Sequence, residues 1–199
     1  MKASGPHDIV FATNNAHKLK EMREIMGDEW NVLGLRDIGH TGDLPETSET
    51  LQGNALQKAR EVKRLYGMDC FADDTGLLVD ALGGEPGVYS ARYAGPDHDS
   101  EANVALLLER MEGKTDRSAR FVTVIALVEG DDETLFEGVA EGSITTGRHG
   151  QGGFGYDPVF RPSGSMLTFA EMTDGEKNAV SHRGRATRQL VEFLKKHNK

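Results

Sequence analysis

The sequence has little cysteine and no long apolar run. One cysteine in 199 residues excludes an internal disulfide framework and fits a reducing compartment. No apolar run approaches the roughly 20 residues that a membrane helix needs, and residues 1–8 lack the hydrophobic stretch of a signal peptide. We therefore expect a cytoplasmic protein without a membrane partner.

The sequence also lacks a basic excess, since 23 Lys and Arg residues stand against 32 Asp and Glu residues for a net charge of -9. Nucleic-acid binders usually carry the opposite balance, so we expect no nucleic-acid partner. A small polyphosphate is still compatible, because a few focused cations can bind it. The length suits one domain or two intimately joined lobes over residues 1–199.

The most informative stretch runs from Cys70 to Gly76, where a short apolar run meets two adjacent carboxylates. Neighbouring side chains of a strand point to opposite faces, so we expect one of Asp73 and Asp74 to face the core and the other to lie at the strand's end or in solvent. Carboxylates at that place, followed by Thr75, suit a Mg²⁺ site completed by water and substrate phosphates. The alternative is an ordinary turn, because Asp, Thr and Gly commonly end strands.

A polar loop near the start of the chain has the features of an anion site. Residues 9–13 are predicted to form a strand, and a helical apolar period begins at about Lys18. The loop between them directs backbone N–H groups and the positive end of the helix dipole at its ligand, which favours phosphate, and Lys18 adds a cation. As an alternative, its asparagines only form a turn and a helix cap. The candidate phosphate-binding residues are Thr13, Asn14, Asn15, Ala16, His17 and Lys18.

A second helix is predicted over residues 51–66, after a polar loop. Asn54 and Lys58 are four residues apart and share a face, which could present an amide and an ammonium group to a ligand. A solvated lysine is the alternative. Glu46 or Glu49 in the preceding loop could supply a second metal carboxylate, and each could equally be a loop acid or a cap.

The second half of the chain predicts a helix over 100–111 capped by Ser100, then two strands. Residues 119–128 form a continuous apolar run typical of a buried strand, and residues 130–132 connect it to a strand over about 134–144 as a hairpin. We therefore predict an α/β fold with a mixed sheet, parallel in its first half and antiparallel in its second.

Five glycines lie between Gly147 and Gly155, followed by an aromatic and acidic segment. Such density indicates positive backbone dihedrals or close approach of the backbone to another group. An aromatic ring held there, such as that of Phe154, could stack on a nucleobase. A flexible linker is the alternative, although linkers usually lack Tyr156 and Asp157.

The last helix begins with clustered basic residues. If Ser181 is its N-cap, then His182, Arg183 and Arg185 lie in the first turn, where the helix dipole disfavours cations by roughly 0.3–1 kcal/mol each. Lys177 lies just before them. The sequence therefore indicates that this positive charge has a functional role. The alternative is a basic helix start that is simply exposed to solvent.

Four separated stretches together resemble one family, the non-canonical purine nucleotide pyrophosphatases, also called the inosine triphosphate pyrophosphatase, Ham1-like or RdgB-like family. The similarity covers nearly the whole chain in the right order. Each motif alone is weak, whereas the ordered set is highly specific. The stretches are Thr13–Lys18; Glu46 with Asn54-Ala55 and Lys58-Ala59; Phe71–Gly76 with Pro86–Arg92; and Gly152–Pro158 with Lys177 and Ser181–Arg183.

This resemblance implies a long, bent mixed β-sheet flanked by helices, two lobes with a central cleft, and a homodimer. It implies the Mg²⁺-dependent reaction of a purine nucleoside triphosphate with water to give the monophosphate and pyrophosphate, with ITP, dITP and XTP preferred. Asp74 matches the general base and a metal ligand, with Asp73 and Glu46 as acidic partners. The remaining matches imply substrate-binding roles for Thr13–Lys18, Lys58, Thr75, Phe154, Gly155, Tyr156, Asp157, Lys177, His182 and Arg183.

Two other functions are compatible with parts of the sequence. One is a Maf-like pyrophosphatase of other nucleotides, against which the segment Phe154–Asp157 and the triplet Ser181–Arg183 argue. A non-hydrolysing regulatory module that binds nucleotides has no need of Asp73 and Asp74 together. Gly53 departs from the family pattern, which often has Glu there, so Glu46 or Glu49 must compensate.

Overall fold

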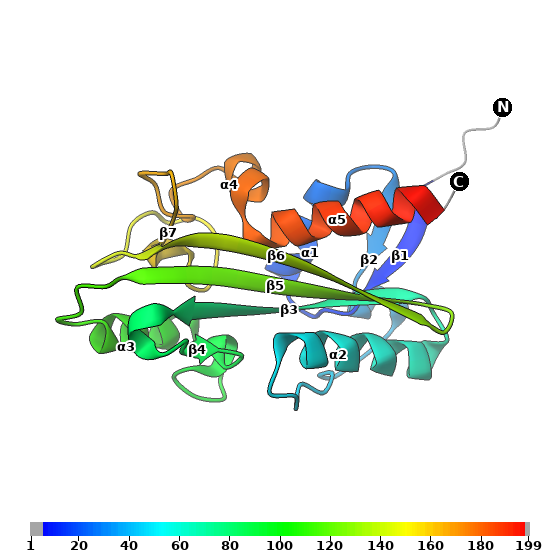
Figure 1. Cartoon of the computed structure of the whole chain (residues 1–199). Coiled ribbons are helices and arrows are strands. Elements are labelled where there is room, and N and C mark those ends of the chain that lie inside the picture. Colours follow the sequence, from blue (N-terminus) through cyan, green and yellow to red (C-terminus); the bar gives the residue numbers. More distant parts are fainter. Residues whose placement is uncertain (1–5, 198–199) are drawn as a thin grey trace. The chain divides into compact units, whose positions relative to one another are not determined.

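The computed structural model describes residues 6–197, in which strands and helices alternate along the chain (Figure 1). The strands are β1 (His7–Phe11), β2 (Trp30–Leu33), β3 (Cys70–Val79), β4 (Pro86–Gly87), β5 (Ser118–Glu129), β6 (Asp132–Ile144) and β7 (Phe160–Pro162). The helices are α1 (Ala16–Met26), α2 (Leu51–Tyr66), α3 (Ser100–Arg110), α4 (Asp174–Val180) and α5 (His182–His197). None of the helices in residues 6–197 has the length and apolar character needed to cross a membrane.

The strands form a mixed sheet in the order β2-β1-β3-β5-β6-β7, with β4 added beside β3. β1 pairs in parallel with β2 and β3, whereas β4 is antiparallel to β3 and β7 is antiparallel to β6. The α/β class and the mixed sheet are therefore confirmed. The predicted hairpin is also present, since β5 and β6 are neighbours joined by a two-residue turn at 130–131.

The described chain divides into two compact units. Unit 1 comprises residues 6–74, 124–137 and 186–197, and unit 2 comprises residues 75–123 and 138–185. The boundary falls inside β3, β5, β6 and α5, so each of these elements continues from one unit into the other. That the whole chain acts as one domain stays a prediction.

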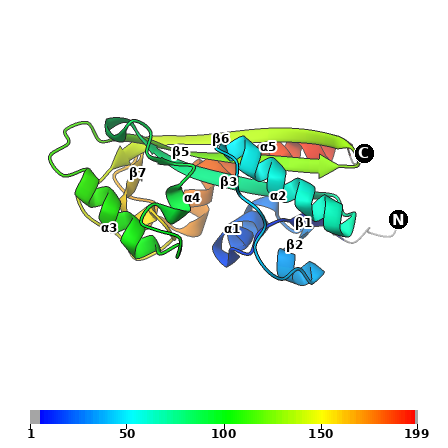
Figure 2. The ribbon, with the colours of Figure 1, turned by 90° about the horizontal axis from the view of Figure 1, so that it is seen from below.

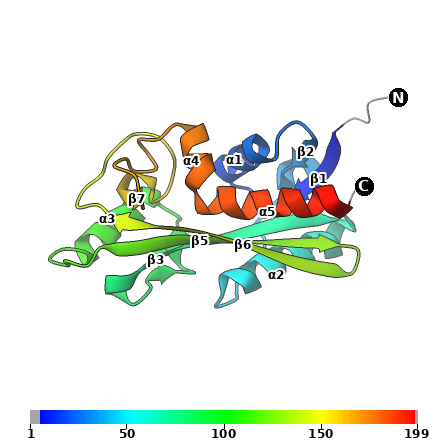
Figure 3. The ribbon, with the colours of Figure 1, turned by 45° about the horizontal axis from the view of Figure 1, so that its top comes forward.

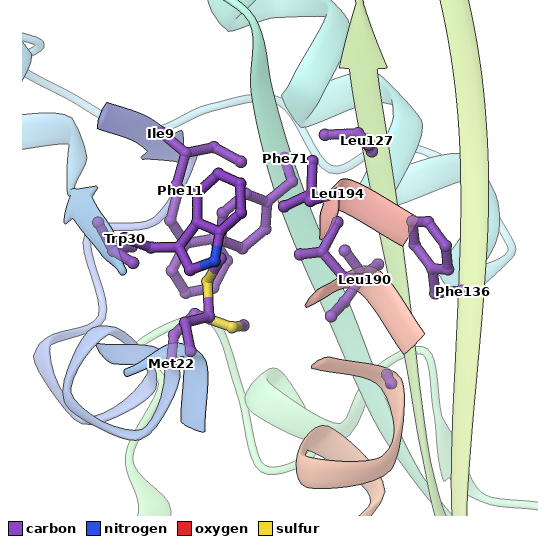
Figure 4. Close-up of a cluster of buried hydrophobic side chains, with 13 residues drawn as sticks. Ile9, Phe11, Met22, Trp30, Phe71, Leu127, Phe136, Leu190 and Leu194 are labelled. Carbon is purple, nitrogen blue, oxygen red and sulfur yellow. The ribbon is translucent and has the colours of Figure 1, made fainter. Parts of the chain in front are cut away.

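Unit 1 has its own apolar core between its strands and two helices (Figure 4). The rings of Phe11 and Phe71 stack with centroids 4.7 Å apart, and Met22 from α1 and Leu190 from α5 pack into the same cluster. Helix α5 lies along the strands with α1 beside it (Figure 3), and α2 covers the opposite face (Figures 1 and 2). Both faces of β3 are thus covered within this unit.

Unit 2 has a second core, built from the other halves of the same long strands. It joins Leu77 of β3 with Leu107 and Met111 from α3 and its C-terminal end, and with Phe160 of β7. The ring of Phe121 packs against that of Phe160 with centroids 4.7 Å apart. Helices α3 and α4 lie on opposite sides of the strands of this unit (Figure 1).

Several predicted boundaries need correction. The N-cap of α3 is Asp99, which accepts hydrogen bonds from the N–H groups of Glu101 and Ala102, so Ser100 is already helical. Helix α4 was not predicted, although Thr173 and Glu176 form a capping box at its start. The two-residue β4 was also missed, because so short a strand has no periodicity to detect.

Candidate active site

The loop before α1 is organised by the side chain of Asn15. As the N-cap, Asn15 accepts hydrogen bonds from the backbone N–H groups of His17 and Lys18 at 3.0 and 3.1 Å. The alternative interpretation of this asparagine as a helix cap is therefore correct. The cap fixes the N-terminal end of α1 just after the carboxyl end of β1, and Lys18 in the first turn of α1 reaches Asp73 inside β3.

Other residues of the loop are held by backbone and side-chain contacts. Thr13 Oγ1 accepts from the N–H of Asn15 at 3.1 Å, and Asn14 Nδ2 donates to the carbonyl of Gly42 at 2.8 Å. Asn14 and Ala16 are exposed, as are Asn15 and His17. The loop is therefore ordered by local hydrogen bonds and exposed within unit 1, and its role in binding an anion stays a prediction.

The two adjacent carboxylates of β3 are both buried, which corrects the prediction that one of them lies at the strand's end or in solvent. β3 continues without interruption through Asp73 and Asp74 to Val79. Asp73 is 1% exposed and accepts a hydrogen bond from Lys18 Nζ of α1 at 2.9 Å. Asp74 points to the other face, where Asn54 of α2 donates to it at 3.0 Å. Both carboxylates can be buried because helices cover both faces of β3 and each helix supplies a polar partner.

The predicted face of α2 is present and buried. Lys58 is 7% exposed and forms an ion pair with Glu46 of the preceding loop. The solvated-lysine interpretation is therefore wrong. Glu49 is exposed, whereas Glu46 is half-buried and pairs with Lys58. The role of Glu46 as a metal ligand stays a prediction.

Lys18, Glu46, Lys58, Asp73 and Asp74 form what we call the acid–lysine cluster, all within unit 1. Burial raises the pKa of Asp74 and outweighs the opposing effect of the two lysines. Burial would also raise the pKa of Glu46, but Lys58 reverses this and leaves it below its usual range. Burial would lower the pKa of Lys58, whereas the three carboxylates raise it overall. Within one cluster, the pKa of Asp74 is thus raised while that of Glu46 is lowered.

A second group of predicted residues gathers around the ring of Phe154 in unit 2. Lys177 Nζ lies 4.7 Å from the ring centroid, and the guanidinium carbon of Arg183 lies 5.6 Å from it. Lys177 also donates to Asp157 at 2.6 Å, and Arg183 donates to Thr75 Oγ1 at 3.2 Å. These five residues, which we call the Phe154 group, place aromatic surface beside two cations and a carboxylate.

Helix α5 explains how the basic residues reach this position. Ser181 Oγ accepts from the N–H of Gly184 at 3.0 Å and caps the start of α5 as predicted. Arg183 is 2% exposed and His182 is also buried, so a solvated basic helix start is wrong for both. Arg185 is exposed and donates to a backbone carbonyl at 2.8 Å.

Three predicted residues have evident structural roles. Tyr156 is buried in the core of unit 2, where its hydroxyl donates to the carbonyl of Ser90 at 2.7 Å. The imidazole ring of His182 stacks on Phe121 with centroids 4.4 Å apart. Gly155 adopts a φ of 59°, which glycine accommodates best. The glycine-rich segment is therefore a folded loop and not a linker.

From the sequence, Asn54 was predicted only to share with Lys58 a helix face that could contact a ligand. It is 1% exposed and contacts Asp74 directly. The contact of Thr123 with Thr75, whose hydroxyl oxygens lie 2.6 Å apart, was not predicted. Thr123 lies in an apolar run that otherwise indicates only a buried strand. A polar residue inside such a run was the available signal.

A strand that leads through a short loop into a capped helix start is a common anion-binding arrangement, and here it lies beside the acid–lysine cluster. The family model described as the Ham1 family matches residues 9–193, and the chain belongs to this family. A dITP/XTP pyrophosphatase from Porphyromonas gingivalis is 52% identical over 187 residues, which cover 94% of this chain and 96% of that protein. One from Flavobacterium psychrophilum is 48% identical over 94% of this chain and 98% of its own length.

Solved structures agree with this assignment. The Ham1 protein of Staphylococcus aureus superimposes with a TM-score of 0.86 at 37% identity, covering 96% of this chain and 99% of that one. A HAM1 protein from Coxiella burnetii superimposes with a TM-score of 0.87 at 39% identity and the same coverage. The predicted family and the fold class are confirmed.

Proposed function

We propose that this chain is a Mg²⁺-dependent pyrophosphohydrolase that converts dITP, XTP and ITP to the nucleoside monophosphate and pyrophosphate. The observation that carries the proposal is the acid–lysine cluster, with its buried Asp74, beside the capped start of α1. The names of the curated relatives, which are dITP/XTP pyrophosphatases, support the substrate class. Water attacks the α-phosphorus, the bond from that phosphorus to the bridging oxygen breaks, and pyrophosphate leaves.

The residues of unit 1 would handle the phosphates and the proton. Lys18 and the loop from Thr13 to His17 bind the triphosphate, because a helix N-terminus and a cation both favour an anion. Asp74 takes the proton of the attacking water, since its burial raises its pKa toward the range of a useful base. Lys58 offsets the negative charge of Asp74 and Glu46, and Asp73 holds the ammonium group of Lys18 through an ion pair.

The donor chemistry of this cluster fits Mg²⁺. Asp74 and Glu46 offer carboxylate oxygens, the ligands that Mg²⁺ prefers. The two carboxylates are close enough that the charge of Glu46 contributes to the raised pKa of Asp74. A cation bound by both would relieve this repulsion. When bound, Mg²⁺ would neutralise charge on the triphosphate and on the leaving pyrophosphate.

The Phe154 group would bind the base and the sugar-phosphate. Phe154 offers a ring that can stack on a purine, and Lys177 and Asp157 fix its surroundings. Inosine and xanthine carry a 6-oxo acceptor where adenine carries an amino donor, so donors from His182 or Arg183 would favour them. A homodimer in the cytoplasm is proposed from the family resemblance.

Pyrophosphate release from dITP, XTP, ITP, ATP and GTP, with Mg²⁺ or with EDTA, tests the proposal. We expect rapid release from the first three substrates, little from ATP and GTP, and none in EDTA. Release of orthophosphate would contradict the bond assignment. Binding of ITP without any hydrolysis would indicate a regulatory module instead.

A further inference from the structure

Helix α2 holds the Glu46 loop through three consecutive loop residues. Lys58 pairs with Glu46, as described above. Gln57 and Thr47 exchange two hydrogen bonds, each 2.9 Å long, and the N–H of Ser48 donates to Asn54 Oδ1 at 2.9 Å. Because the helix and the loop run in opposite directions, each loop residue meets its own partner on one face of α2.

Asn54 differs from Gln57 because it also forms a hydrogen bond with a carboxylate of β3. Its Nδ2 donates to Asp74 Oδ2 at 3.0 Å while its Oδ1 accepts from Ser48, and the side chain is 1% exposed. The orientation of the amide is fixed chemically, since a carboxylate accepts only from NH₂ and a backbone N–H donates only to the oxygen. One buried amide thus joins the Glu46 loop to Asp74.

We infer that Asn54 is a positioning residue that sets the orientation of the Asp74 carboxylate and ties it to the loop carrying Glu46. The inference rests on the proposed function, in which Asp74 activates water. Without the amide, the carboxylate loses a donor that restrains its rotation about its last bond and stabilises its charged form. A misplaced base slows the chemical step more than it weakens substrate binding.

The approach of this loop to α2 depends on Gly53. A Cβ at Gly53 would lie 1.9 Å from Ser48 Oγ, which is far inside any allowed contact. Gly53 therefore leaves the space into which Ser48 packs. Ser48 in turn brings its N–H to Asn54 at hydrogen-bond distance.

Two substitutions of Asn54 separate its contacts. Asn54→Asp keeps an acceptor for Ser48 but replaces the donor to Asp74 by a carboxylate oxygen, whereas Asn54→Ala removes both contacts. Gln57→Ala is the matched control, because it removes both hydrogen bonds to the same loop and Gln57 forms none with Asp74. We expect both Asn54 variants to lower kcat for dITP by about 10–100-fold with KM changed by less than about 3-fold. Gln57→Ala should keep kcat within about 2-fold of the wild type.

A second measurement does not depend on turnover. The affinity for an α,β-methylene analogue of dITP, measured in EDTA, should be the same within about 3-fold for the wild type, Asn54→Asp and Gln57→Ala, because the phosphate loop is intact in all three. If Asn54→Ala does not fold, the kcat of Asn54→Asp compared with that of Gln57→Ala tests the inference. A wild-type kcat in Asn54→Asp, or an equal loss in Gln57→Ala, would overturn the inference. A wild-type chain that releases no pyrophosphate would overturn the proposed function instead.

Discussion

At the scale of single residues, Asp74 is placed where a charge is costly. The two lysines of the acid–lysine cluster face three carboxylates, so the cluster keeps one net negative charge when every group is ionised. Burial raises the pKa of Asp74 despite both lysines, so folding disfavours the charged form of Asp74 relative to the unfolded chain. Its proposed role as a base thus comes at the expense of stability.

We predict that Asp74→Asn lowers pyrophosphate release by about 10²–10⁴-fold, the usual contribution of a general base. The same change should leave the free energy of unfolding at pH 7 equal to that of the wild type or above it. A raised folded-state pKa means that the stability due to Asp74 is present below its ordinary pKa and is lost as pH rises through the folded value.

The pH dependence of unfolding checks this assignment. Any stability advantage of Asp74→Asn should be present at neutral pH and shrink in acid, where Asp74 is protonated in both states. Thermal unfolding of both proteins from pH 3 to pH 8 measures it. If Asp74→Asn is instead less stable than the wild type at neutral pH and recovers in acid, the folded protein stabilises the charged form of Asp74, which contradicts the prediction.

At the scale of elements, α2 combines the ordinary apolar stripe of a surface helix with a polar face that is also buried. Ala55, Ala59 and Val62 pack inward, while Asn54 and Lys58 contact acidic groups. Such a helix is sensitive to its distance from the loop before it. Gly53 sets that distance, because a side chain there would overlap Ser48.

We predict that Gly53→Ala destabilises the protein by about 1–3 kcal/mol, the usual cost of overpacking, although alanine is the better helix former. Gly175→Ala is the matched control, because Gly175 also lies in a helix and its added Cβ would meet nothing within 4 Å. That variant should be neutral or stabilised by up to about 1 kcal/mol. Denaturant unfolding compares them, and the double change Ser48→Gly with Gly53→Ala should recover part of the loss.

At the scale of the whole molecule, the two compact units have separate apolar cores but share their long strands. β3, β5, β6 and α5 each continue from one unit into the other. If one half of such a strand unfolds, the other half is no longer held at the point where the two halves join. The chain connectivity therefore couples the stability of the two cores.

We predict a single cooperative unfolding transition, with a calorimetric enthalpy equal to the van't Hoff enthalpy. The expected enthalpy near 60 °C is about 140 kcal/mol, from roughly 0.7 kcal/mol per residue. Differential scanning calorimetry of the chain at two protein concentrations measures it. Two resolved transitions would show that the units unfold independently, against the predicted single domain.

The sequence alone supports much of this description. The apolar period over residues 51–66 predicted α2 with its true bounds, because an amphipathic stripe is a local property. The hairpin of β5 and β6 was likewise predictable from a buried run and a polar turn. The ordered motifs identified the family, because residues that bind one kind of ligand recur at matching places in the chain.

Only the tertiary structure decided how the charged residues are used. A strand pattern places Asp73 and Asp74 on opposite faces but cannot tell whether both faces are covered, since the covering helices come from distant segments. For the same reason the burial of Lys58, its ion pair with Glu46 and the two contacts of Asn54 were not predictable. Local periodicity determines which element forms, whereas the burial and partners of a charge depend on packing between segments far apart in the chain.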